Sequence, residues 1–197
     1  MQEFLHFFYM GMRHVLNVHG YEHILFLIAL LVPFEFKDWK KILILITLFT
    51  LGNTISLLLS VYGVVYINQH ILNVLIPVLI LVLAFFHLFT AGKSGKGEGI
   101  TFISLVTLFF GIIHGLGFAT HFKNILGNST LDKLLPLLEF STGIEAGQLV
   151  VVLVVLILSY IVQTFFRFSK RDWTLVMAAF VIGVVLPTIV ESPLWIR

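Results

Sequence analysis

The chain has 197 residues, of which 59% are hydrophobic and only 11% are charged, so an ordinary soluble domain is excluded because too little charge remains to cover its surface. The formal net charge of +2 is too small to indicate nucleic-acid binding, and the absence of cysteine excludes disulfides, thiolate metal sites and cysteine nucleophiles. We expect an all-α, polytopic transmembrane helix bundle that forms a single integral membrane domain over 1–197 in a lipid bilayer.

Residues 1–19 form the first predicted element, an N-terminal segment that is consistent with more than one arrangement. The segment is apolar enough to enter the bilayer but carries Arg13, His14 and Asn17. It could be an interfacial helix, a re-entrant helix or an additional span. We favour an interfacial or re-entrant helix, which leaves 20–190 for the helix bundle.

Six long apolar spans follow. A helix needs roughly 20 residues to cross a hydrocarbon core, and we compare the length of each segment with this value. The spans are 21–34, 42–62, 71–90, 100–121, 136–164 and 173–190. Lysine and arginine gather in the connections 35–41, 91–99 and 165–172, whereas the other two connections carry only Lys123 and Lys133. The positive-inside rule therefore places the three basic connections in the cytoplasm, and we expect a multi-pass membrane protein.

Polar and ionisable side chains interrupt these spans, mostly in the half nearest the outer side. Such residues are costly in hydrocarbon and usually mark a site. His19, Glu22 and His23 open the first span at a spacing that puts them on one helix face, where two imidazoles and a carboxylate can hold a divalent ion. Capping of the helix start is the structural alternative.

The fourth and fifth spans carry the remaining strong candidates. His114 lies among the glycines 111, 115 and 117, which let helices or a ligand approach closely, and His121 follows two turns later. Glu145 and Gln148 are three residues apart in front of a long apolar run, with Ser141 four residues before Glu145. Hydrogen bonding between helices is the structural alternative for these side chains.

The candidate metal ligands therefore come from four segments of the chain. They are His14, His19, Glu22, His23, His114, His121, Glu145 and Gln148, with Asn17, Asn53, Asn73 and Ser141 as weaker or supporting ligands. Only nitrogen and oxygen ligands are present, which leaves zinc, nickel, cobalt, iron and manganese open. Because one ion takes about four to six ligands, the surplus predicts more than one ion per chain in the outer half of the bundle.

Four stretches of the chain resemble the HupE/UreJ family of bacterial membrane proteins: GYEHILFLIALL, TLFTLGNTISL, FFGIIHGLGFA and FSTGIEAGQL. The resemblance covers roughly 11–165. It implies a multi-pass protein of the bacterial inner membrane that acts as a nickel or cobalt permease linked to hydrogenase or urease maturation. The family's motifs fall on Gly20 to Phe26, His114 to Ala119 and Glu145 to Gln148. This chain departs from them with Glu22 for Asp, Asn53 for His and Asn73 for Glu.

Two functions from different classes are compatible with these residues. We favour a metal-dependent hydrolase that cleaves an amide or ester in a lipid-like substrate, with Glu22 or Glu145 as general base toward a metal-bound water. The alternative is a nickel/cobalt or other divalent-metal permease. The ligand surplus, the outer position of the ligands and the apparent lack of broken helices favour the hydrolase, because transporter sites usually lie near the midplane between half-helices.

Overall fold

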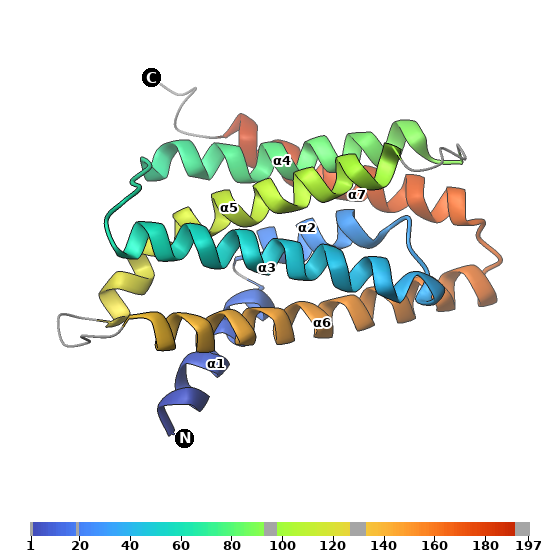
Figure 1. The fold of residues 1–197 in the computed structure, drawn as a ribbon. Coiled ribbons are helices and arrows are strands. Elements are labelled where there is room, and N and C mark those ends of the chain that lie inside the picture. Colours follow the sequence, from blue (N-terminus) through green and yellow to red (C-terminus); the bar gives the residue numbers. More distant parts are fainter. Residues whose placement is uncertain (1, 19, 93–97, 127–132, 192–197) are drawn as a thin grey trace.

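The computed structural model describes residues 2–18, 20–92, 98–126 and 133–191, and within these ranges the chain is helical throughout, without strands. Seven α-helices follow one another in this part of the chain (Figure 1). They are α1 (Gln2–Leu16), α2 (Glu22–Leu31), α3 (Trp39–Val61), α4 (Gln69–Thr90), α5 (Glu98–Leu126), α6 (Leu134–Phe165) and α7 (Lys170–Val190), with the 3-10 helix η1 (Phe36–Asp38) before α3. The predicted polytopic all-α bundle is confirmed.

The expected number of six long spans is wrong by one within the described residues. Five helices are long and apolar enough to cross a membrane, namely α3 to α7. The predicted first span contains only α2, whose 10 residues rise about 15 Å, half of a hydrocarbon core. The helix begins late because the chain turns at Gly20, where the amide donates to the carbonyl of Asn17, and it ends at Leu31, two residues before Pro33.

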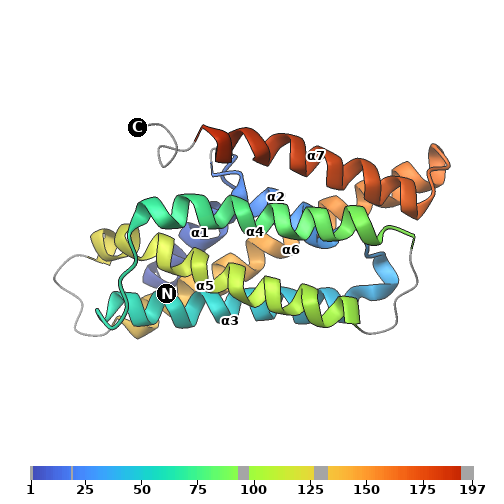
Figure 2. The same ribbon diagram turned by 90° about the horizontal axis from the view of Figure 1, so that it is seen from above.

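The long helices run back and forth, so α3, α5 and α7 begin at one end of the bundle, whereas α4 and α6 begin at the other (Figure 1). In the sequence, each of the three connections that gather lysine and arginine leads into α3, α5 or α7, so we call the first end the basic end. Figure 2 shows α7 along one edge, beside α4, on which it packs.

Close packing between two pairs of helices depends on glycine. A Cβ on Gly143 of α6 would overlap the carbonyl oxygen of Phe8 in α1, and a Cβ on Gly111 of α5 would overlap that of Phe49 in α3. Backbone contact at small residues is a common means of association between membrane helices. It fixes α1 obliquely across α6 and holds α3 against α5, the two helix pairs that position the site described next (Figure 1).

Candidate metal centre

Three histidines from three helices meet inside the bundle. His14 lies in the last turn of α1, His23 in the first turn of α2 and His114 in the second half of α5. The break between α1 and α2 brings the first two together, because it lets the chain turn within the bundle instead of passing through it. We call these residues the histidine triad.

The triad is compact enough to share one ion. One ring nitrogen from each histidine can be chosen so that all three atoms lie within 4.8 Å of one another. The Nε2 atoms of His14 and His114 are 3.4 Å apart. Two nitrogens bound at about 2.1 Å to one tetrahedral ion also lie about 3.4 Å apart. The ring centroids of His23 and His114 are separated by 3.9 Å, and those of His14 and His23 by 4.6 Å.

Two ring nitrogens of the triad are buried without a hydrogen-bond partner, Nε2 of His23 and Nδ1 of His114. Their side chains are 3% and 8% exposed. A buried polar atom without a partner is unfavourable, and a cation bound at the triad would give Nε2 of His23 a partner.

Aromatic rings enclose the triad along the bundle axis. One turn before His114, Phe110 stacks on Phe26 at a centroid distance of 3.8 Å, and Phe49 lies 5.8 Å from Phe26. One turn after His114, Phe118 stacks on Phe140 at 4.9 Å and contacts the His14 ring at 4.1 Å. We call Phe26, Phe49 and Phe110 the inner aromatic layer, because it lies toward the basic end. Phe118 and Phe140 are the outer aromatic layer.

The candidates on α6 face a row of threonines on α3. The Thr47 hydroxyl donates to Glu145 at 3.1 Å, that of Thr50 to Gln148 at 3.2 Å, and that of Thr54 to Ser141 at 2.8 Å. The threonines follow one another at helical spacing on one face of α3. That spacing is visible in the sequence, but it does not indicate that the threonines face α6. We call these six residues the polar seam.

The structure does not bring the remaining candidates into the triad. Glu22 is half-buried, and its Oε2 lies 3.8 Å from where a Cβ on Gly20 would be, while His121 is exposed against Phe118. Asn73 is exposed and accepts a hydrogen bond from Gln69 at 3.3 Å.

The two remaining asparagine candidates are Asn17, which lies three residues after His14 in the sequence, and Asn53, which packs against α5 close to His114 in the fold. Asn17 is exposed in the break between α1 and α2, and its carbonyl accepts from Gly20. Asn53 is 1% exposed, and both polar atoms of its side-chain amide lack a partner. Its backbone carbonyl faces Gly115, the residue after His114. His19 lies outside the described residues.

Fold and site together define a polytopic membrane protein with a buried cluster of histidines suited to a transition-metal ion. A family model described as "HupE / UreJ protein" matches residues 1–191, so the chain belongs to the HupE/UreJ family, as the sequence motifs had indicated. No curated protein and no solved structure matches the chain significantly.

Proposed function

We propose that this protein is a divalent-metal permease of the nickel and cobalt class, and that the histidine triad binds the transported ion. The observation that carries the proposal is the triad itself, in which three imidazoles from α1, α2 and α5 converge with ligand atoms within 4.8 Å. Imidazole suits nickel, cobalt and zinc. Family membership supports transport of nickel or cobalt as the substrate.

The short helices α1 and α2 support transport over hydrolysis. Transporter sites are commonly built where discontinuous helices end inside the membrane. Here α1 ends at Leu16 and α2 begins at Glu22, with His14 and His23 on either side of the break. The carbonyl end of α1 is favourable for a cation, and Glu22 in the first turn of α2 offsets the positive end of that helix. Broken helices were not expected from the sequence.

The two aromatic layers suit alternating access. The inner layer separates the triad from the basic end, and the outer layer covers it on the other side. An ion held by the triad would reach one side of the membrane when one layer opens and the other remains closed. Each layer joins different helices, α2, α3 and α5 for the inner layer and α5 and α6 for the outer layer. A small shift of α5 would therefore change the contacts in both layers.

The arrangement of side chains supports the hydrolase expected from the sequence less well than it supports the permease. Neither of the expected general bases belongs to the group of closely spaced ligand atoms found among the described residues. Glu145 instead accepts a hydrogen bond from Thr47 in the polar seam. A second ion could use Glu145, Gln148 or Asn53, but these residues stay outside the triad, so one transported ion is the simpler proposal. No observation favours a lipid-like substrate for this site.

Uptake into vesicles tests the proposal. Purified protein in proteoliposomes should show saturable uptake of Ni²⁺ or Co²⁺ down an imposed gradient. His114→Ala should reduce uptake at least about tenfold, because losing one of three ligands removes more than about 1.4 kcal/mol of binding. The matched control is His70→Ala, since His70 is an exposed histidine at the start of α4. Absence of uptake, together with chelator-sensitive cleavage of lipid amides or esters, would overturn the permease in favour of the hydrolase.

A further inference from the structure

A cavity lies at the basic end, away from the triad. Its volume is about 1090 Å³, within reach of the size of small-molecule sites. Its walls come from the turn after α2, the end of α4 and the first turns of α5 and α7. Apolar side chains that include Phe34, Phe86, Phe102 and Ile103 form one part of the lining, and basic residues form the other. The lining is therefore amphipathic.

The basic part of the lining holds Lys41, Lys170 and Arg171, and among the described residues that line the cavity there is no aspartate or glutamate. Gly99 and Ile100 at the start of α5 also line it, as does Ser169 at the start of α7. The N-terminal ends of helices favour anions. The same charges oppose a divalent cation, so the cavity does not suit the ion that we assign to the triad.

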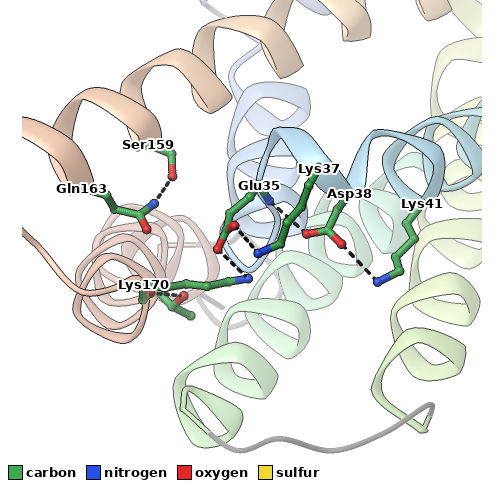
Figure 3. A network of polar contacts seen from close by, with 8 residues as sticks. Glu35, Lys37, Asp38, Lys41, Ser159, Gln163 and Lys170 are labelled. Carbon is green, nitrogen blue, oxygen red and sulfur yellow. Dashed lines mark hydrogen bonds and ion pairs between the residues drawn. The ribbon is translucent and has the colours of Figure 1, made fainter.

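Acidic neighbours neutralise two of the three cations (Figure 3). The Nζ of Lys170 lies 3.2 Å from Oε1 of Glu35, and that of Lys41 lies 3.1 Å from Oδ1 of Asp38. Asp172 is also near, but it is held by the Ser169 hydroxyl. Arg171 has no ion pair within the described ranges.

Gly92, two residues after the end of α4, leaves space for the Arg171 side chain. The Cδ of Arg171 lies 2.9 Å from where a Cβ on Gly92 would be, and Gly92 has a φ of +81°. A side chain at this position would therefore be strained and would displace the arginine. Glycine at position 92 therefore leaves room for the Arg171 side chain, which lines the cavity.

His87 supplies an independent observation in the same cavity. Its side chain is 3% exposed, it lines the cavity, and its Nε2 is buried without a hydrogen-bond partner. An imidazole N–H can donate to a phosphate oxygen, and an arginine can donate two parallel hydrogen bonds to the same group. His87 and Arg171 thus place one polar group in a buried part of the lining and one in an exposed part.

We propose that this cavity binds the phosphate group of an anionic membrane lipid, with Arg171 and His87 as its main polar contacts. The apolar walls take the first part of the acyl chains, which a free phosphate ion lacks. Basic pockets between membrane helices are suited to such headgroups. This site does not depend on the function that we assign to the histidine triad.

Lipid-dependent thermal stability of the full chain in detergent tests the site. Dioctanoyl phosphatidylglycerol should raise the Tm saturably, whereas dioctanoyl phosphatidylcholine and inorganic phosphate should not. Arg171→Gln should weaken the apparent affinity for phosphatidylglycerol about tenfold, as expected for loss of a bidentate charged contact. His87→Phe should weaken it as well while keeping an aromatic ring in place. Lys40→Gln removes an exposed cation near the basic end that does not line the cavity, and it should leave the affinity unchanged.

Three results would overturn the proposal. One is an unchanged response of the Arg171→Gln variant to phosphatidylglycerol. Because Arg171 is exposed, this variant should fold normally. Another is equal stabilisation by phosphatidylcholine. The third is equal stabilisation by inorganic phosphate, which would identify a site for the free anion. His114→Ala should retain the lipid response, so this proposal and the permease proposal can fail separately.

Discussion

At the residue scale, the triad is held ready for a ligand at a thermodynamic cost. A buried polar atom without a partner typically costs about 1–3 kcal/mol, and His23 and His114 each contribute one. Asn53 adds an unpartnered amide on the face of α3 that packs against Gly115. An ion bound at the triad would give Nε2 of His23 a partner and stabilise the folded chain by mass action.

A second residue-scale feature is the charge network around Glu35 (Figure 3). The hydrogen bond from Lys37, together with Lys170, holds the pKa of the Glu35 carboxyl below its usual value of 4.5. The contact to Lys170 joins the start of α7 to the segment before α3. Both partners are partly exposed, so the contribution to stability is below about 1 kcal/mol.

This network predicts a small, pH-dependent contribution to stability. Because folding lowers the pKa of Glu35, its contribution is fully present above about pH 4.5 and is lost as the pH falls through the lower folded value. Glu35→Gln should therefore lower the Tm slightly at pH 7, and the difference from wild type should shrink as the pH approaches 3. Thermal unfolding in detergent from pH 7 to pH 3 measures this difference. A difference that stayed constant over this range would contradict the assignment.

The residue scale also shows what could be predicted from the sequence. His114 and His23 were recognisable as candidates because an ionisable side chain among apolar membrane residues is costly and usually marks a functional site. The third member of the triad, His14, lies in the N-terminal segment 1–19, where the hydropathy pattern did not decide between an interfacial helix, a re-entrant helix and a span. The polar seam was missed as a unit because residues on α3 and α6 are about 90 positions apart, and sequence periodicity carries no information on which helices are neighbours.

At the element scale, the break between α1 and α2 determines the site. The run from Tyr21 to Phe34 is apolar enough to suggest a span, yet only ten of its residues are helical. Gly20 and Pro33 mark both limits in the sequence, but their combined effect depends on α1 packing back onto α6. Hydropathy alone therefore overestimated this element, while it located α3 to α7 well.

The glycine contacts that dock α1 should be required for metal binding. A Cβ on Gly143 would overlap the Phe8 carbonyl, so Gly143→Ala should push α1 from α6, displace His14 and lower stability by about 1–3 kcal/mol. Gly183→Ala is the matched control, because nothing lies within 4 Å of a Cβ there on α7. Tm and Co²⁺ affinity would both be measured. Equal effects of the two substitutions would argue against docking of α1 through these glycines.

At the scale of the whole molecule, the helices that follow the basic connections all begin at one end (Figure 1). This separation agrees with the charge asymmetry in the sequence and favours a cytoplasmic basic end. It would put the outer aromatic layer on the periplasmic side and the lipid cavity in the cytoplasmic leaflet, where anionic headgroups attract basic residues. The orientation remains a prediction of the charge pattern.

Single cysteines can test the orientation, because the chain has no cysteine of its own. Lys37→Cys lies at the basic end, and Tyr66→Cys lies in the exposed link between α3 and α4 at the opposite end. A membrane-impermeant maleimide added to intact cells of a bacterial host should label Tyr66→Cys alone, and Lys37→Cys only after the membrane is opened. Labelling of both variants in intact cells, or of Lys37→Cys alone, would contradict the predicted topology.

The account depends most directly on whether the histidine triad holds a metal ion. Co²⁺ titration of the detergent-purified chain, followed by calorimetry and by the visible absorption of the bound ion, measures this. We predict saturation at about one equivalent, with a spectrum typical of nitrogen ligands. His14→Ala, His23→Ala and His114→Ala should each weaken binding at least about tenfold, whereas His70→Ala should not. Unchanged affinity in all three triad variants would contradict the account.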